Sequence, residues 1–175
     1  MSRAGRTSVS AHVEKVRVPV HLSQPNRDPR DGWLLLLPQV EAEDRAESLV
    51  ELLNSRRSVI PFIPSDDASV LLLTRLNIDW VAVGDGVEPS LVFPPDGFPT
   101  REQRAEMQFV DLRRLEVGLQ WYAEEDDHIR LSDFLNTPAD FVTARTGFGT
   151  LILNKHRIRE IRITRPAARA VGRAG

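Results

Sequence analysis

A basic cluster stands near the end of the sequence, where Lys155, His156 and Arg157 follow one another. The apolar run at 151–153 precedes the cluster and isoleucines recur after it at 158, 161 and 163, which predicts a hairpin between two strands with these side chains at its tip. Two cations and an imidazole at such a tip could hold a phosphate or stack on a nucleobase. The other interpretation is an ordinary solvated turn, and we favour it.

Positive charge continues along the last predicted strand, residues 158–163, through Arg159 and Arg162. The isoleucines of this strand are expected to face largely inward, which leaves a basic strip that could bind RNA or an acidic protein. Charged side chains on an edge strand also prevent aggregation, and we favour that second interpretation. The candidate binding residues are therefore Lys155, His156, Arg157, Arg159 and Arg162.

An acidic run with a histidine, residues 124–128, offers the oxygen and nitrogen ligands that metal ions use. Adjacent residues rarely converge on one ion, and the spacing fits no calcium loop or zinc-binding helix, so we interpret the run as a solvated turn that caps the next helix. Ser132 and Asp133, with His128 or His156, could form a nucleophile and its base, but no glycine-flanked turn presents the serine. Both residues suit the first turn of a helix instead. We predict no enzymatic activity, no metal site and no cofactor.

The overall composition limits the possible partners. The 23 lysines and arginines nearly balance the 25 aspartates and glutamates, so no bulk field attracts nucleic acid or anionic lipid. The absence of cysteine excludes disulfides and thiolate chemistry, and it fits a reducing compartment. No apolar run approaches the roughly 20 residues that span a bilayer, and the first 12 residues lack the apolar core of a signal peptide. These features predict a cytoplasmic protein with no membrane contact.

The candidate residues belong to a segment that resembles an earlier part of the chain. Residues 49–54 align with 131–136, and residues 71–83 align with 151–163 without a gap. Apolar character is kept at most of the aligned positions that would face a core. We interpret the chain as two diverged copies of one unit.

Each copy has the same predicted order of elements, β-β-α-β-β-β. Strands are indicated by alternating or continuous apolar runs, and helices by apolar residues at i, i+3 and i+4. We expect Asn54 and Asn136 to end the two helices in the left-handed conformation. The predicted strands are 16–22, 33–37, 58–62, 70–74, 78–83, 108–112, 117–122, 141–144, 150–154 and 158–163. The predicted helices run from about Glu41 to Asn54 and from Ile129 to Asn136, with one further helical turn at 100–105.

These elements predict a mainly β fold with short helices (α+β), arranged as tandem pseudo-symmetric units. The units would form small barrels, because closure removes exposed strand edges, or they would share one sheet or sandwich. With 41% hydrophobic residues, the 175-residue chain can bury a real core. The predicted organisation is a flexible basic tail at 1–12, a first β-rich repeat at 13–83, a connector at 84–105, a second repeat at 106–163 and a flexible basic tail at 164–175.

Residues 130–136, Arg-Leu-Ser-Asp-Phe-Leu-Asn, are followed after one strand by Leu-Ile-Leu-Asn-Lys-His-Arg-Ile at 151–158. This pattern resembles an uncharacterised family of small bacterial domains with an R-L-S-D-[FY]-L-N signature, and the first copy matches it in degenerate form. The resemblance implies a small bacterial β-rich domain and brings no known catalytic residues. Residues 154–158 are also similar to the second signature of Sm-like RNA-binding barrels, although the helix here follows two strands rather than preceding the first.

Three functions are consistent with these features. The first is a non-catalytic protein-interaction or assembly module of a bacterial cytosolic system, which binds a protein partner through sheet edges, through an apolar surface with Trp33 or Trp121, or through the basic last strand, and which also forms a homo-oligomer. An alternative is an Sm-like RNA-binding protein that uses residues 155–157. A third alternative is a receptor for a nucleotide second messenger. It is weaker than the other two because the arginine pair and the D/N-x-S-x-x-G element that are usual in such receptors are not evident in the sequence.

Overall fold

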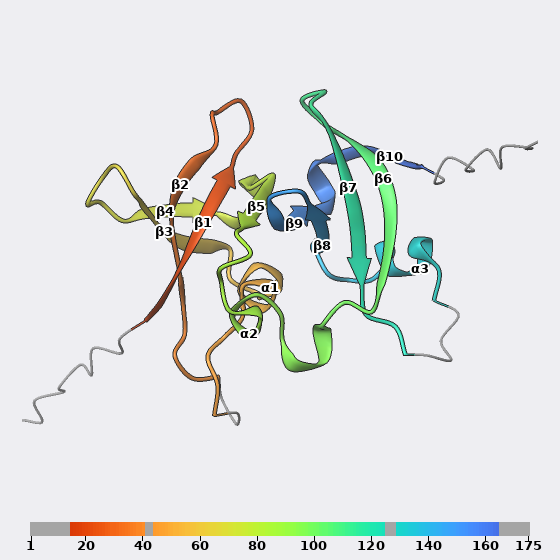
Figure 1. The fold of residues 1–175 in the computed structure, drawn as a ribbon. Helices are drawn as coiled ribbons and strands as arrows, with labels where there is room; N and C mark the ends of the chain where they lie inside the picture. Colours follow the sequence, from red (N-terminus) through yellow and green to blue (C-terminus); the bar gives the residue numbers. More distant parts are fainter. Residues whose placement is uncertain (1–14, 41–43, 125–128, 165–175) are drawn as a thin grey trace, which may run out of the picture.

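The structure is a computed structural model that describes residues 15–40, 44–124 and 129–164. Ten strands and three short α-helices lie in these ranges, which confirms a mainly β fold with short helices (Figure 1). The strands are β1 (Val16–Ser23), β2 (Arg30–Leu36), β3 (Val59–Pro64), β4 (Leu71–Thr74), β5 (Trp80–Val83), β6 (Arg101–Phe109), β7 (Arg114–Trp121), β8 (Phe141–Thr146), β9 (Gly149–Asn154) and β10 (Ile158–Ile163). The α-helices are α1 (Leu49–Asn54), α2 (Pro89–Val92) and α3 (Leu131–Leu135), and the 3₁₀ helices are η1 (Arg75–Asn77), η2 (Pro95–Gly97) and η3 (Lys155–Arg157).

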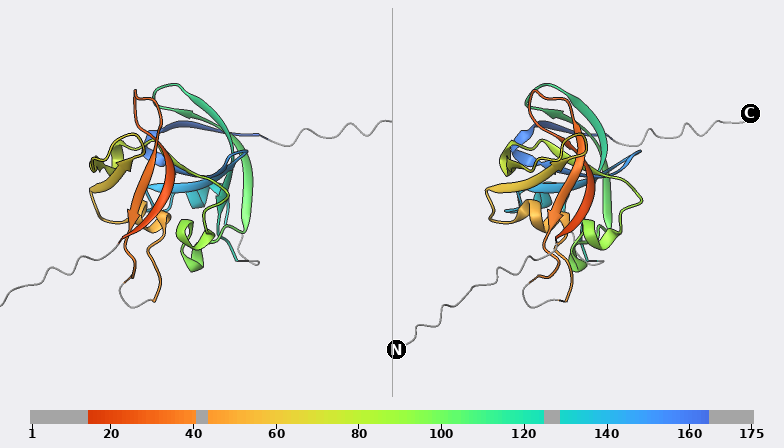
Figure 2. Two further views of the ribbon diagram at one scale, coloured as in Figure 1. Left: turned by 60° about the vertical axis from the view of Figure 1, so that its left-hand side comes forward. Right: turned by 90° about the vertical axis from the view of Figure 1, so that its left-hand side faces the viewer.

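All ten strands form one antiparallel sheet in the order β10-β6-β7-β8-β9-β5-β1-β2-β3-β4. The sheet is strongly curved, and β6 and β7 arch away from β8 and β9 (Figure 2). It nevertheless stays open, which corrects the expectation of closed barrels. The reason is that β5 and β9 pair with each other in the middle of the sheet, while β10 and β4 remain at its two ends.

The strands follow the same order in both halves of the sheet. The first half reads β5-β1-β2-β3-β4 and the second reads β10-β6-β7-β8-β9, so the last strand of each half lies beside its first strand. The registers agree as well: when Thr74 is matched with Asn154, the pairing of β4 with β3, β3 with β2 and β2 with β1 corresponds to that of β9 to β6, and it matches Leu22 with Met107. Leu22 lies opposite Val81 in the β1–β5 pair, and Met107 lies opposite Ile161 in the β6–β10 pair.

Apolar side chains form two core clusters, one in each half. The first is built mainly by β1 to β5 and α1, and it also includes Phe141 and Ile152 from the second half. The second is built by β6 to β9, and Trp80 and Ala82 from the first half pack against it. The central strand pair β5–β9 therefore contributes to both clusters, because alternate side chains of a strand point to opposite faces.

Helix α1 begins at Leu49 and not near Glu41, where the acidic residues suggested a start. Residues 41–43 lie outside the described ranges. Ser48 is the N-cap, and its hydroxyl accepts a hydrogen bond from the Glu51 backbone N–H at 3.3 Å. The Glu51 carboxylate accepts one from the Ser48 backbone N–H at 2.8 Å, which completes a capping box. This box fixes the start of the helix, and Leu49, Leu52 and Leu53 are buried as their spacing predicts.

The Glu51 carboxylate gives a testable pH dependence. Its hydrogen bond from Arg45, with further bonds from Ser48, lowers the pKa of Glu51 from 4.5 to about 2. A carboxylate with a lowered pKa in the folded state stabilises the fold above pH 5, and this contribution is lost as the pH falls from about 4.5 towards 2. We expect Glu51→Gln to lower the free energy of unfolding by about 2 kcal/mol at pH 7, and by much less at pH 2.5. Urea titrations at both pH values would measure the difference, and an equal loss at both would contradict it.

The strand β6 differs most from the prediction. Residues 100–105 were expected to form a helical turn and residues 108–112 a strand, whereas β6 spans Arg101–Phe109 and thus takes in the end of the predicted connector. The residues after it form a turn in which Leu112 has a φ of 71°. Ala105, Met107 and Phe109 alternate with exposed or half-buried residues, and pairing with β7 along the whole strand outweighs the helix preference of its glutamate, glutamine and arginine residues.

The predicted tails lie almost entirely outside the described residues, which exclude 1–14 and 165–175. Within the described ranges, none of the helices has the length and apolar character that crossing a bilayer requires.

Candidate functional site

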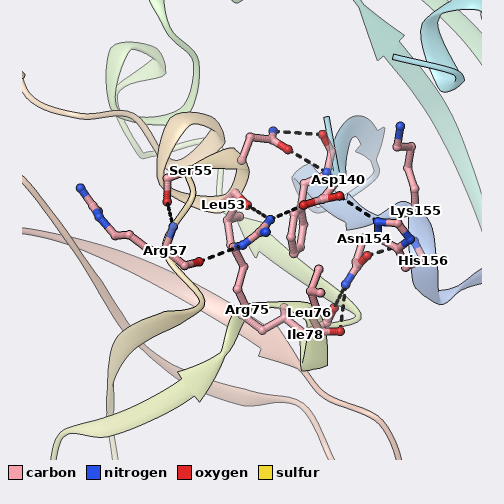
Figure 3. A network of polar contacts seen from close by, with 12 residues as sticks. Leu53, Ser55, Arg57, Arg75, Leu76, Ile78, Asp140, Asn154, Lys155 and His156 are labelled. Atoms are coloured by element: carbon pink, nitrogen blue, oxygen red, sulfur yellow. Dashed lines mark hydrogen bonds and ion pairs between the residues drawn. The ribbon is translucent and has the colours of Figure 1, made fainter. Parts of the chain in front are cut away.

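Polar contacts beside the centre of the sheet connect the two halves of the chain, and Figure 3 shows those around Asp140 and Asn154. In this junction Trp80 lies opposite Leu153, and Val83 lies opposite Thr150. The β5–β9 ladder is only four residue pairs long, so side-chain bonds on either side of it contribute much of the connection.

Asp140 is one centre of the network, just before β8. Its carboxylate forms an ion pair with Arg75 Nη1 at 2.7 Å and a hydrogen bond with His156 Nε2 at 2.8 Å. Arg75 also donates to the backbone carbonyls of Leu53 at 2.9 Å and Arg57 at 3.0 Å. The His156 and Arg75 side chains hold the pKa of Asp140 below its ordinary value, so it remains a carboxylate at neutral pH.

Asn54 connects α1 to β8. Its side-chain Nδ2 donates to the Phe141 carbonyl at 3.1 Å, and its Oδ1 accepts from the Phe141 N–H at 2.9 Å. The expectation of a left-handed helix end is wrong at both asparagines. Asn136 has a φ of −87°, and among the described non-glycine residues only Asn26 and Leu112 have a positive φ. The side-chain amide of Asn54 forms hydrogen bonds with the other half of the sheet rather than with its own helix end.

Asn154 bonds across the junction from the end of β9. Its side chain is fully buried, and its Nδ2 donates to the carbonyls of Leu76 at 3.2 Å and Ile78 at 2.9 Å. Its Oδ1 accepts from the His156 N–H at 3.0 Å, and its backbone N–H donates to the Asp79 carbonyl at 3.0 Å. Asn154 therefore satisfies polar groups that would otherwise be buried without partners.

Asp79 is the second charged centre, at the start of β5. Its side chain is 2% exposed and accepts from Arg113 Nη2 and from Arg157 Nε, the latter at 2.9 Å. Arg113 also bonds to Ser23 Oγ at 3.0 Å and Asp111 Oδ2 at 2.6 Å. A buried carboxylate needs such partners, because an unpaired charge in the interior is strongly destabilising.

The three residues of the predicted hairpin tip lie on η3, and the segment is not a hairpin. Strands β9 and β10 pair with β5 and β6 respectively and not with each other, so η3 carries the chain from one end of its half to the other. Lys155 Nζ donates to the carbonyls of Leu135 at 3.0 Å and Thr137 at 2.7 Å, and burial lowers the pKa of Lys155. With His156 bonded to Asp140 and Arg157 to Asp79, all three side chains have partners within the chain.

The arginines of the predicted basic strip lie on β10 at one end of the sheet. Arg162 is 60% exposed, and it pairs with Glu160 at 3.2 Å and more loosely with Glu106 at 4.0 Å. Arg159 is exposed and forms no ion pair with any residue in the described ranges. Ile161 packs against the second core cluster, whereas Ile163, which was expected to face largely inward, is 46% exposed.

An apolar groove of about 1140 Å³ lies beside the junction, between β1 and β2 on one side and the β8–β9 turn on the other. Trp33, Trp80, His21 and Phe148 contribute aromatic surface to its lining. Trp33 thus lines this groove. Trp121 does not, because it is only 9% exposed and stacks on Phe134.

The sequence interpretation missed Asp79, Asp140 and Asn54 as polar anchors. Asp79 had a signal: it stands within an apolar strand, where the aligned residue of the second copy is Arg159. A charge at such a position indicates either an exposed edge or a buried ion pair. Asp140 had no comparable signal, because its partner Arg75 is far away in the sequence.

The acidic run at 124–128 lies mostly outside the described residues, which exclude 125–128. Among those that are described, no three acidic, histidine or cysteine side chains are close enough together to hold a metal ion.

Comparison with known proteins identifies no relative. No family model, no curated protein and no solved structure matches the chain. The resemblance of residues 130–136 to a bacterial family therefore stays a prediction from the sequence.

Proposed function

We propose that this protein is a non-catalytic assembly module of the bacterial cytosol, which self-associates through the two end strands of its sheet. The observation that carries the proposal is the exposure of apolar side chains at β4 and β10, the two strands that have a neighbour on one side only. An unprotected sheet edge is a template for pairing with another chain, so an edge that exposes apolar residues is suited to binding.

The same proposal includes an origin of the chain from two copies of one β-β-α-β-β-β unit. The equal strand order of the two halves supports it, as does the shared register at β1–β5 and β6–β10. A detail at the 3₁₀ helices adds support. Arg75, the first residue of η1, donates to the Leu53 carbonyl, and Lys155, the first residue of η3, donates to the Leu135 carbonyl at the aligned position.

The apolar residues at the ends are well exposed. Leu72 of β4 is 73% exposed and Val70, just before β4, is 55% exposed, while Ile163 of β10 is 46% exposed. Soluble proteins commonly protect edge strands with charge, and β10 has such charges in Arg159, Glu160 and Arg162, but β4 has none. The β4 edge is therefore less protected against pairing with another strand than the β10 edge.

The RNA-binding alternative has less support. It depends on Lys155, His156 and Arg157, whose side chains already bond to groups within the chain. Releasing them for RNA would break contacts of the junction. No observation on the described residues favours the nucleotide-receptor alternative.

A lysine at the β4 edge should prevent association. We expect the purified protein to have a mass above the 19.7 kDa of one chain in light scattering, and Leu72→Lys to reduce it towards that value, because the charge blocks strand pairing. Phe148→Lys is the matched control, since Phe148 is 92% exposed but lies in the β8–β9 turn, away from both edges. A monomeric wild-type protein, or an equal effect of both variants, would contradict the proposed function. Absorbance at 260 nm that follows the protein peak would support RNA binding instead.

A further inference from the structure

We propose that copies of this chain associate head to tail, with β10 of one copy pairing antiparallel with β4 of the next in the register of the internal β5–β9 pair. This inference rests on the proposed self-association and specifies its geometry. The binding partner at both ends of the sheet is thus a second copy of the same chain.

The internal junction provides the template. There, the last strand of the first half, β5, pairs with the fourth strand of the second half, β9. The corresponding strands that lack such a neighbour are β10, the last of the second half, and β4, the fourth of the first half. They lie at opposite ends of the sheet, so the same pairing between copies would continue the sheet without disturbing it.

The apolar residues at the edges face each other in this register. Val81 lies opposite Ile152 in the internal pair, and the aligned residues are Ile161 and Leu72. The most exposed residue of the β4 edge would therefore be covered by a half-buried isoleucine of β10. Such directly opposite side chains have Cβ atoms about 5 Å apart and stabilise a strand pair.

The next pair on the same face agrees with the first. Val83 lies opposite Thr150 in the internal pair, and the aligned residues are Ile163 and Val70. Ile163 is 46% exposed and Val70 is 55% exposed, so head-to-tail pairing would cover both. Three of the exposed apolar side chains of the molecule would thus be buried by one contact.

Head-to-tail pairing would also form an ion pair that corresponds to one at the internal junction, with the acidic and basic residues exchanged. In the internal junction Asp79 binds Arg113, which follows the turn between β6 and β7. Arg159 is the residue aligned with Asp79, and the strand registers match Arg113 with Asp28, which follows the turn between β1 and β2. Both are exposed, and neither forms an ion pair within the described ranges. Head-to-tail pairing would bring Arg159 of one copy towards Asp28 of the next.

Asn136 could form between copies the hydrogen bonds that Asn54 forms at the internal junction. Asn54 uses its side-chain amide to bond both backbone groups of Phe141 at the internal junction. Asn136 is the residue aligned with Asn54, and Val59 corresponds to Phe141 because these two lie opposite the aligned residues Thr74 and Asn154. The Asn136 side chain is exposed and forms no hydrogen bond within the part of the chain that the structure describes, and Val59 at the start of β3 is 42% exposed.

A contact between two β4 edges or between two β10 edges accounts for fewer of these features than the contact of β10 with β4. A contact between two β4 edges would leave Arg159 and Asn136 without partners, and a contact between two β10 edges would place the arginines of both copies along one seam. Head-to-tail contacts use two different surfaces, so they give a ring if the rotation closes and an open chain if it does not.

Engineered cysteines distinguish the arrangements, because the chain has none of its own. Leu72→Cys and Ile161→Cys variants of different tag length are mixed under native conditions and treated with a mild oxidant or a short bis-maleimide. We expect a strong crosslink between the two variants and at most a weak one within either variant alone. The pair Leu72→Cys with Arg159→Cys, which is out of register on the same edges, is the control and should crosslink several-fold less.

The outcomes separate this inference from the proposed function. Crosslinks within Leu72→Cys alone or within Ile161→Cys alone would overturn the head-to-tail arrangement while leaving self-association in place. A monomer in light scattering would remove both proposals. A second measurement uses Asn136→Ala, which should weaken association about tenfold through two lost hydrogen bonds and leave the thermal unfolding of the monomer unchanged. Unaltered association in Asn136→Ala would contradict the shared use of the two asparagines.

Discussion

Asp79→Ala is expected to lower the free energy of unfolding by about 3 kcal/mol, because it removes a buried carboxylate that lies between two arginines. Arg113 and Arg157 both form ion pairs with this carboxylate, and without it their charges would lack this partner in a place that is partly shielded from water. Their partial exposure, 39% and 25% of the side chain, lets water reach them and keeps the loss from being larger. Chemical denaturation at pH 7 measures the effect.

Asp31→Ala is the matched control for this prediction. Asp31 also forms an ion pair, with His21 at 2.9 Å, but its side chain is 75% exposed. An exposed pair contributes little to stability, so the loss should stay below about 0.5 kcal/mol. Similar losses in the two variants would show that Asp79 does not hold the halves together.

Asn154→Ala should be comparably destabilising, by about 3 kcal/mol, although no charge is removed. The substitution leaves the buried carbonyl of Ile78, the carbonyl of Leu76 and the His156 N–H without their side-chain partner. Each unsatisfied buried group costs about 1 to 3 kcal/mol. Urea unfolding followed by tryptophan fluorescence measures the loss.

The control for Asn154 is the aligned residue of the first half, Thr74. It is exposed at the β4 edge, so Thr74→Ala should change the stability of the monomer by less than about 1 kcal/mol. If both substitutions have the same effect, the buried bonds of Asn154 contribute nothing specific.

The sequence predicted those elements whose pattern is local. Alternation of apolar residues located β1, and the isoleucines at 158, 161 and 163 located β10, with boundaries close to those of the structure. The i, i+3, i+4 spacing at Leu131, Phe134 and Leu135 located α3. In these segments a side chain's own neighbours in the sequence determine which face is apolar.

The prediction failed where distant partners decide. Residues 100–105 were expected to form a helical turn, yet 101–105 form part of β6 because each of them pairs with β7. The polar network could not be predicted from local sequence for the same reason, since Arg75 and Asp140 are 65 residues apart. Asn54 was interpreted through its local helix, whereas its amide bonds to Phe141, 87 residues away.

The two-sided role of β9 has an evolutionary consequence. Ile152 belongs to the core cluster of the first half, whereas its neighbours Leu151 and Leu153 belong to that of the second. Natural selection therefore acts on consecutive codons of this strand through two different sets of neighbours. The two halves therefore cannot change independently, because a replacement at Ile152 has to suit a core encoded by the other half of the gene.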